Sequence, residues 1–352
     1  MNLDNIESLA SIDSMDMLGS LSRFPEQIDQ SYALVSESDI PRFYDVDHVI
    51  ICGVGEDALA GYLLAGFLYE KITLPIIVHT TGPLPKWVNK HTLVYSISST
   101  GNHTETISSF KQAIQKHCKI IGISSNGTLK DYCLHRNLPF VEVYESIPSR
   151  LALGFLFFTI LFSLQKTGLL NLGLDSDIDE TRFILHQMQK QLPPNVSFNE
   201  NPAKQLAMKI KDSIPLIFGW DLFSIVAKRW TMQCNLNAKL ISYYYSVPEC
   251  MYYSLVGWAN QQQSQQYTSI IFRDHQLESK EMKKRLQFLE RFCEEVHTQK
   301  ICVQPTGKSI LSKIFSLVYL GDYMSVYAAL NADIDPSPTP ILQQLDEELN
   351  SF

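Results

Sequence analysis

The sequence predicts an α/β fold of two doubly wound parallel-sheet domains followed by a C-terminal helix. Short β-branched and apolar runs alternate with helical segments of about 12 residues, which is the pattern of strands joined by crossover helices. The alternation stops at a polar helical stretch and then starts again, so the chain reads as two similar halves. Its 352 residues are 45% hydrophobic and 19% charged, which is ordinary for a globular protein with more than one domain.

In the first half we expect a helical lead-in over residues 1–45 and a domain over residues 46–170. The run 151–164 is the most apolar part of the chain. Its length, about 14 residues, is short of the roughly 20 that a membrane helix needs, so it predicts a buried core helix. Strands are expected at 46–52, 74–78, 93–98, 119–124 and 139–143, with helices after the first strand to residue 69 and at 108–117.

In the second half we expect a helical connector over residues 171–200, which Pro193 and Pro194 end, and a second domain over residues 201–352. A last helix is expected at 340–350. Within the domain, strands are expected at 214–219, 239–245, 268–272 and 300–303, with helices at 222–233, 278–295 and 309–331.

Charge and composition exclude several classes of partner. A net charge of −8 argues against nucleic acid or an anionic membrane surface. Seven scattered cysteines without a C-x-x-C pair indicate reduced thiols and a cytoplasmic protein, and residues 1–8 lack the pattern of a signal peptide. The nine histidines show no metal-ligand spacing, so no metal is expected. Gly53-Val-Gly55 before a helix suggests a dinucleotide, but the acidic residue expected at the end of the next strand is absent.

The segment 98–107 has the residues of a phosphate-binding loop. The expected strand 93–98 runs into small and hydroxyl-bearing residues, namely Ser98, Ser99, Thr100, Gly101 and Asn102. Asn102 and Glu105 form a capping-box pattern that predicts a helix start at Asn102. Free N–H groups and the helix dipole favour an anion in such a loop, although an ordinary strand-to-helix turn looks the same. His103 could face a ligand from this loop or face solvent.

Arg150 stands just before the most apolar run. A charged group at that place must be paired or face a cleft, because burying it alone is costly. The alternative is a surface arginine at a helix N-terminus, which the helix dipole mildly disfavours. We therefore expect Arg150 to be functional.

Several motifs in order resemble the bifunctional phosphoglucose/phosphomannose isomerases, which are built from two sugar-isomerase (SIS) domains. The likeness covers nearly all of the chain. Segment 98–107 is similar to the family's Ser-Tyr-Ser-Gly-Asn-Thr-Glu-Glu-Thr loop, and 148–154 to its Pro-Arg-Ala-Ala-Leu-Gly helix start. Further matches lie at Asp13 with 17–18 and 25–27, at 229–239, at 248–249 and 257–258, and at 320–338.

The resemblance implies two SIS-type domains and a homodimer that converts hexose 6-phosphates between aldose and ketose. In the family a glutamate moves a proton between C1 and C2 through a cis-enediolate, a histidine opens the sugar ring, an arginine steadies the enediolate, and a lysine of the last helix lies at the site. No cofactor is implied. The partner implied is a sugar or a sugar phosphate, and Arg150 takes the place of the family's arginine.

The other catalytic positions are substituted. The family's glutamate, histidine and lysine align with Leu236, Tyr252 and Asp346. Leucine cannot accept a proton, and a positioned general base is typically worth about 10²–10⁴-fold in rate. These substitutions predict that the isomerase activity is weak or lost.

The phosphate region also departs from the family pattern. The family's Gly-x-Gly-Gly-Ser becomes Gly53-Val-Gly55-Glu56-Asp57, and a threonine of the phosphate loop becomes His103. A carboxylate about 4 Å from a phosphate charge costs roughly 4 kcal/mol at an effective dielectric constant near 20. The motif match predicts that Gly55 and Asp57 lie at the ligand site. Because of the carboxylate charge, a neutral or cationic ligand fits this site better. Arg150 or a protonated His103 could offset part of this cost.

The sequence alone does not decide between three functions. The first is a family member by descent whose isomerase activity is weak or lost and which keeps a sugar-derived ligand. The second is a non-catalytic sugar sensor or a scaffold for a partner protein. The third is an active isomerase with a substitute base, for which Glu249 is the nearby carboxylate we nominate.

Overall fold

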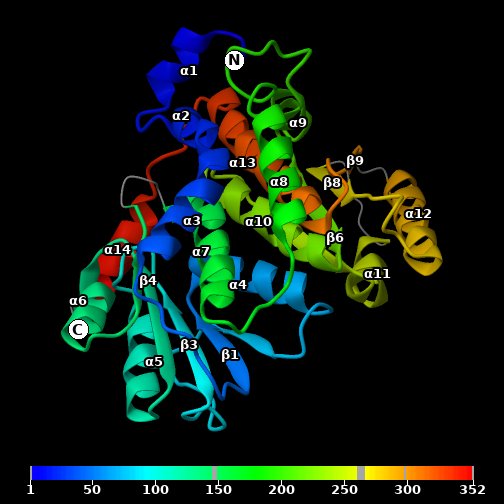
Figure 1. Cartoon of the computed structure of the whole chain (residues 1–352). Helices are drawn as coiled ribbons and strands as arrows, with labels where there is room; N and C mark the ends of the chain where they lie inside the picture. The colour runs from blue at the N-terminus through cyan, green and yellow to red at the C-terminus, as the bar shows by residue number, and fades with distance from the viewer. Residues whose placement is uncertain (1, 145–148, 260–265, 297–298, 351–352) are drawn as a thin grey trace. The chain divides into compact units, whose positions relative to one another are not determined.

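The computed structural model describes residues 2–144, 149–259, 266–296 and 299–350 (Figure 1). The chain forms two compact units. The first unit is Arg23–Arg182, and the second unit is Met1–Ser22 together with Phe183–Phe352. The expected lead-in over residues 1–45 is thus divided between the two units. The other boundary between the units lies in the expected connector, between Arg182 and Phe183, inside helix α8, Asp175–Met188.

The first unit holds a five-stranded parallel sheet in the order β2-β1-β3-β4-β5. The strands are β1 His48–Cys52, β2 Ile76–His79, β3 Thr92–Ile97, β4 Lys119–Ser124 and β5 Phe140–Glu142. The helices are η1 Phe24–Glu26, α3 Gln27–Glu37, α4 Gly55–Leu68, α5 Thr104–Gln115, α6 Gly127–His135, η2 Ser149–Leu151 and α7 Leu153–Lys166.

Both faces of this sheet are covered, which is why its strands are apolar almost throughout. Helices α5 and α6 cover one face, where Ile50 and Val94 pack into one core cluster with Phe110 and Leu129 (Figure 1). On the other face α4 lies against β1 and β2, and α7 packs on α4 and α3. The Ser163 hydroxyl of α7 also donates to the Tyr95 hydroxyl of β3 at 2.9 Å. The central strand β3 and all of residues 153–164 of α7 are buried, as expected for the most apolar run.

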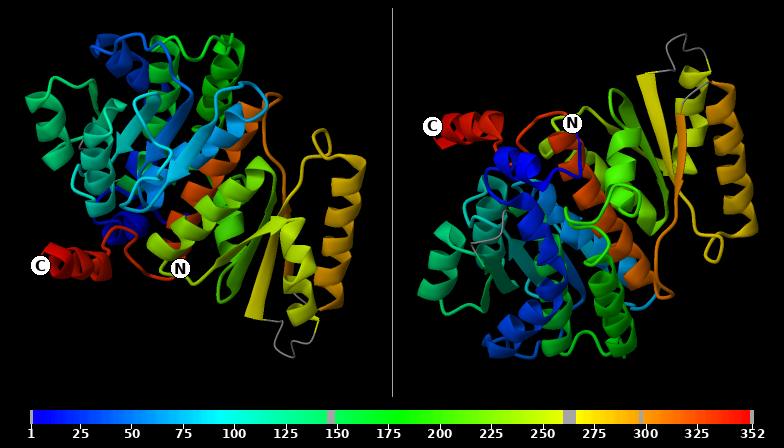
Figure 2. Two further views of the ribbon diagram at one scale, coloured as in Figure 1. Left: turned by 90° about the horizontal axis from the view of Figure 1, so that it is seen from below. Right: turned by 90° about the horizontal axis from the view of Figure 1, so that it is seen from above.

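The second unit holds a four-stranded parallel sheet in the order β7-β6-β8-β9. Helices α10 and α12 lie on opposite faces of it, and α13 packs along α10 and α9 (Figure 2). The strands are β6 Ile214–Trp220, β7 Tyr243–Val247, β8 Tyr267–Phe272 and β9 Gln299–Val303. The helices are α1 Ile6–Ile12, α2 Met17–Ser22, α9 Pro202–Lys209, α10 Leu222–Leu236, η3 Glu249–Tyr252, α11 Ser254–Trp258, α12 Lys280–Glu295, α13 Ile310–Asn331 and α14 Pro340–Asn350.

The predicted class is confirmed: two parallel-sheet α/β units and a helical C-terminus. Several strand boundaries differ from those expected, and the largest difference is at β7. We expected a strand over 239–245, but β7 begins only at Tyr243. Lys239 has a φ of 52°, which an extended strand does not allow, and the N–H of Leu240 turns back to the carbonyl oxygen of Cys234. The sequence pattern also missed helix α6, which opens at a glycine with little apolar periodicity.

No helix in the described part of the chain has both the length and the apolar character that crossing a membrane requires. All seven cysteines are free thiols.

Candidate functional site

The order of strands places two loops of the first unit next to each other. In the order β2-β1-β3-β4-β5 the direction of winding reverses between β1 and β3. Ligands of doubly wound folds bind beyond the carboxyl ends of the strands at such a reversal. The loop after β1 leads to Gly55 and Asp57, and the loop after β3 contains residues 98–103. The structure therefore brings together the two segments that the sequence singled out.

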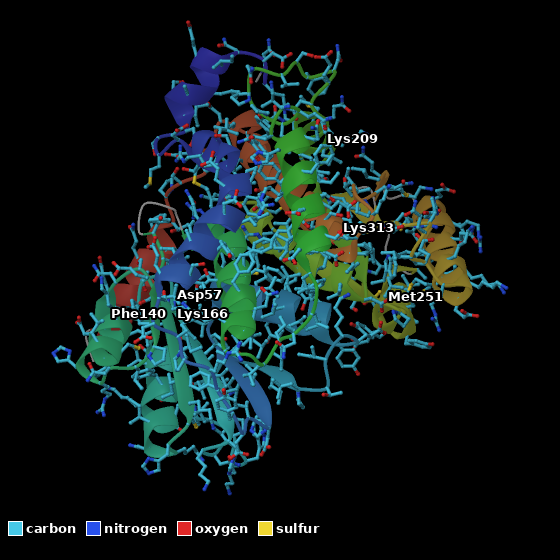
Figure 3. All side chains as sticks on the ribbon, viewed as in Figure 1. Asp57, Phe140, Lys166, Lys209, Met251 and Lys313 are labelled. Carbon is cyan, nitrogen blue, oxygen red and sulfur yellow. The ribbon has the colours of Figure 1, made fainter. Side chains whose placement is uncertain are left out.

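The carboxylate of Asp57 occupies this reversal point. Its Oδ2 accepts a hydrogen bond from the backbone N–H of Ser99 at 2.9 Å and a longer one from the Ser99 hydroxyl at 3.3 Å. Asp57 comes from the first turn of α4 and its side chain is 2% exposed (Figure 3). Its other oxygen, Oδ1, is buried and has no hydrogen-bond partner among the described residues. Gly55, two residues earlier, begins α4 with a φ of 55°. Glu56 lies between them and is partly exposed.

His103 contacts both Asp57 and Ser98 through one ring nitrogen. Its Nδ1 lies 3.2 Å from Asp57 Oδ2 and 3.1 Å from Ser98 Oγ. A proton relay of the serine-hydrolase type needs the two ring nitrogens on different partners. Both contacts use Nδ1 and Ser98 is fully buried, so these contacts help to hold the loop in place.

The expectation that Asn102 caps its own helix was wrong. Helix α5 begins at Thr104, with His103 at the N-cap position and no side-chain capping bond. The Oδ1 of Asn102 instead accepts from the N–H of Thr128 at 3.0 Å and from its hydroxyl at 2.9 Å, in the first turn of α6. The N-cap residue of α6, Asn126, makes no such bond itself. Asn102 therefore caps a helix of the neighbouring loop, because tertiary contact outweighs the local pattern.

Two glycines allow these loops to interlock. Gly101 and Gly127 have φ angles of 76° and 79°, which glycine adopts freely. A Cβ on Gly101 would lie 1.7 Å from the carbonyl oxygen of Asn126, and one on Gly127 would lie 2.5 Å from the carbonyl oxygen of Thr100. The N–H of Leu129 also donates to the carbonyl oxygen of Gly101 at 3.0 Å. The loops after β3 and β4 thus form one rigid surface.

A pocket of about 460 Å³ opens on this surface, and we call it the Ser99 pocket. Its volume lies within the usual range for small-ligand sites. Its lining combines hydroxyl and amide groups with apolar and aromatic groups, including Tyr144 and Phe155, whose rings meet edge to face. The lining residues are Ser99, Thr100, Asn102, Ser125, Asn126, Gly127, Val143, Tyr144, Ser149, Ala152, Phe155 and Leu156.

The sequence did not identify the part of this pocket that follows β4 and β5. A signal was present: Ser124-Ser125-Asn126-Gly127 follows a predicted strand and has the same small, hydroxyl-bearing character as the loop after β3. In a parallel sheet the loops after neighbouring strands meet at one edge, so this second segment could have been added to the site.

Arg150 lies in η2 beside the pocket wall and is half-buried. Its segment is fixed by Gln27, whose Nε2 donates to the carbonyl oxygen of Leu151 at 2.8 Å and whose Oε1 accepts from the N–H of Phe155 at 3.0 Å. Gly154 permits this approach, because a Cβ there would lie 2.7 Å from Gln27 Oε1. Pro148, the first residue of the segment that is similar to the family's helix start, lies outside the described residues.

The remaining predicted positions belong to the second unit. Leu236 is the last residue of α10 and is half-buried. Glu249 and Tyr252 are the first and last residues of η3, both exposed, with Tyr252 at 77%. Asp346 lies in α14, and its side chain is outside the described part of the structure.

Several residues of the family-like segments 229–239 and 320–338 form a buried hydrogen-bond network. Arg229 of α10 makes two hydrogen bonds of 3.0 Å to the carboxylate of Asp322 in α13, and both side chains are fully buried. Gln233 adds a bond to the same carboxylate at 3.1 Å, and Asn237 donates to Ser325 at 2.9 Å. This network joins α10 to α13, so these residues have a structural role in the second unit.

The described residues contain no cluster of three or more His, Cys, Asp or Glu side chains placed to hold a metal ion. The sequence-based expectation that no metal or cofactor is used stays a prediction.

Comparisons with known proteins match most of the chain. Residues 199–349 match the family model of the bacterial phospho-glucose isomerase C-terminal SIS domain. The bifunctional phosphoglucose/phosphomannose isomerase of Caldicellulosiruptor bescii is 30% identical over 335 residues, covering 95% of this chain and 98% of the relative. That of Aquifex aeolicus is 27% identical over 302 residues, covering 86% of this chain and 90% of the relative.

The fold has solved relatives as well. A glucose-6-phosphate isomerase like protein from Thermus thermophilus superposes with a TM-score of 0.66 at 18% identity, covering 99% of each chain. The two parallel-sheet units are therefore SIS-type domains, as the sequence predicted. On the identity and coverage of these relatives, the chain belongs to the bifunctional phosphoglucose/phosphomannose isomerase family.

Proposed function

We propose that this protein is a sugar-binding member of its family in which the isomerisation of hexose 6-phosphates is weak or lost. The proposal rests on Leu236, which the sequence resemblance aligns with the family's proton-transferring glutamate. Aldose–ketose isomerisation through a cis-enediolate takes a proton from one carbon and returns it to the next. A leucine side chain has no group that can hold that proton.

Tyr252 supports the same conclusion. It replaces the family's ring-opening histidine, and its phenol is exposed. A phenol hydroxyl is a poor proton acceptor beside the free ring nitrogen of a neutral imidazole, so tyrosine is a weak replacement for a ring-opening base. The loss of a positioned base typically costs about 10²–10⁴-fold in rate, and here two roles lose their residue type.

Sugar binding is supported by what the first unit retains. The lining of the Ser99 pocket includes hydroxyl and amide groups that can bind sugar hydroxyls, and the rings of Tyr144 and Phe155, which can pack on the apolar face of a sugar ring. Arg150 keeps the residue type of the family's arginine, on a segment that Gln27 fixes. We propose Arg150 as the group that steadies bound ligand.

A working isomerase with a substitute base is the second candidate. Glu249 favours it, because this exposed carboxylate lies in the same short helix as Tyr252. If Glu249 is the base, Glu249→Gln removes activity while keeping the shape of the side chain.

A non-catalytic sensor or scaffold is the third. A melting-temperature screen against hexoses and hexose 6-phosphates separates it from a sugar-binding protein, because any ligand that binds only the native state raises its stability by mass action. A protein that no sugar stabilises would fit the scaffold. We also propose that the protein is cytoplasmic and forms a homodimer. Sedimentation of the purified protein measures its oligomeric state.

The test of the proposal is the conversion of fructose 6-phosphate by purified protein, followed by proton NMR, with Arg150→Ala purified in the same way. Background conversion in both proteins, together with a sugar-induced rise in melting temperature, is expected. Turnover near or above about 1 s⁻¹ that disappears in Arg150→Ala would contradict the proposal, because that is the range of working enzymes.

A further inference from the structure

The loop after β3 presents donors to a single buried oxygen. Oδ2 of Asp57 receives the backbone N–H of Ser99 at 2.9 Å and the Ser99 hydroxyl at 3.3 Å, and Nδ1 of His103 lies 3.2 Å away. A strand, a hydroxyl-bearing loop and a helix N-terminus arranged in this way commonly hold the oxygen of an anionic ligand. Here the oxygen belongs to the protein.

Asp57 is held in this position by the fold. It lies in the first turn of α4, where the helix dipole favours a negative charge, and it is 2% exposed. Oδ1 is buried without a hydrogen-bond partner in the described structure, so the carboxylate is kept there by packing even though half of it is unsatisfied. The carboxylate is thus a fixed part of the loop.

The position of Asp57 is also that of the expected ligand. The strand order reverses between β1 and β3, and the crevice at such a reversal is where doubly wound folds bind ligands. The bond from Ser99 to Asp57 joins the two loops across this crevice. The open pocket lies instead beyond β3, β4 and β5, with Ser99 on its wall.

The pocket itself offers little to a second anion. Among the described residues, those that line it include no Lys, Arg or His to neutralise a phosphate, and Arg150 is not one of them although its neighbour Ser149 is. A phosphate placed at Ser99 would meet the Asp57 charge in a partly desolvated site, where like charges repel strongly.

We propose that Asp57 takes the place of a ligand's phosphate in the loop after β3, so that the Ser99 pocket accepts an uncharged polyhydroxy ligand, a sugar without a phosphate group. This inference rests on the proposed sugar-binding function and specifies its ligand. It also adds a second reason, besides Leu236, for weak turnover of hexose 6-phosphates.

The experiment compares inorganic phosphate binding by wild type, Asp57→Ser and Asp57→Asn, using isothermal titration and the backbone NMR signals of Ser99 and Gly101. Asp57→Ser removes both the charge and the bulk, and Asp57→Asn removes the charge alone. Asp39→Ser, the same change at an exposed aspartate outside the pocket, is the matched control.

Asp57→Ser is expected to bind phosphate at least about tenfold more tightly than wild type, and Asp57→Asn to show a smaller gain. Wild type is expected to bind glucose no more weakly than glucose 6-phosphate, and Asp57→Ser to reverse that preference. If Asp57→Ser does not fold, the comparison of Asp57→Asn with wild type decides in the same way.

The inference is overturned if wild type binds phosphate as tightly as both variants, or if wild type prefers the phosphorylated hexose. A failure of the proposed function is a different result. It would be seen as turnover of fructose 6-phosphate, and it does not depend on the outcome of the phosphate titrations.

Discussion

Asp57 and Ser99 are 42 residues apart in the sequence, yet the Asp57 carboxylate accepts the backbone N–H of Ser99 at 2.9 Å. The bond links the loops after β1 and β3 at the point where the sheet reverses its winding. We propose that the carboxylate held at this point disfavours a phosphorylated ligand, although the fold is that of the family.

Gly101→Ala is expected to destabilise the first unit. The added Cβ would lie 1.7 Å from the Asn126 carbonyl oxygen and would need a φ of 76°, so the loops after β3 and β4 must separate. We expect a loss of roughly 1–3 kcal/mol in the free energy of unfolding in urea, together with weaker ligand binding. Gly173→Ala, where a Cβ meets nothing within 4 Å, is the control. Equal stability of the two variants would show that the interlock of the loops is unimportant.

Asn102→Ala is expected to cost about 1 kcal/mol of stability, because it removes the acceptor for the Thr128 N–H in the first turn of α6. Asn102→Asp is expected to restore it, since a carboxylate also accepts this bond and suits the helix dipole. The measurement is urea unfolding of the three proteins. A carboxylate variant as unstable as the alanine variant would rule out the capping role.

Asp322→Leu is expected to destabilise the second unit by about 3–5 kcal/mol, because it leaves Arg229 buried without its carboxylate. The double variant Arg229→Met with Asp322→Leu is expected to be more stable than Asp322→Leu alone, since no buried charge is left. Unfolding of both single variants and the double variant forms a double-mutant cycle that measures the coupling. Additive losses would mean that the two side chains are not coupled.

The ionisation of Asp4 is expected to contribute to the pH dependence of the protein's stability. A hydrogen bond from Lys204, which is fully buried, lowers the pKa of Asp4 below its ordinary value of 3.8. A lowered carboxyl pKa adds stability that is present above the ordinary value and is lost as the pH falls through the folded-state value. Asp4→Asn should therefore be less stable than wild type at neutral pH, by about 1 kcal/mol or less because Asp4 is partly exposed, and the difference should shrink below pH 3.8. A difference that stays constant with pH would exclude this linkage.

The sequence was informative where local pattern decides the structure. The apolar run of α7 and the alternation of strands and helices are such patterns. The hydroxyl-bearing residues 98–102 also indicated the loop after β3, which the structure places where the sheet reverses its winding. The sequence also singled out Asp57 as an unusual residue beside that loop.

The partners of these residues could not be predicted, because they come from distant parts of the chain. Asn102 has a local capping pattern with Glu105, but its oxygen bonds to Thr128, 26 residues away. Arg229 meets Asp322 across 93 residues. Such contacts depend on which strands are neighbours, and the order of strands is not a local property.

The most direct test of whether proton transfer is lost is deuterium incorporation from D₂O into fructose 6-phosphate at C1 and glucose 6-phosphate at C2. Proton NMR detects formation of the enediolate even when net isomerisation is slow. We predict no exchange above that of Arg150→Ala, because Leu236 cannot carry the proton. Exchange in wild type that is abolished in Arg150→Ala and in Glu249→Gln would contradict this prediction and identify Glu249 as the base.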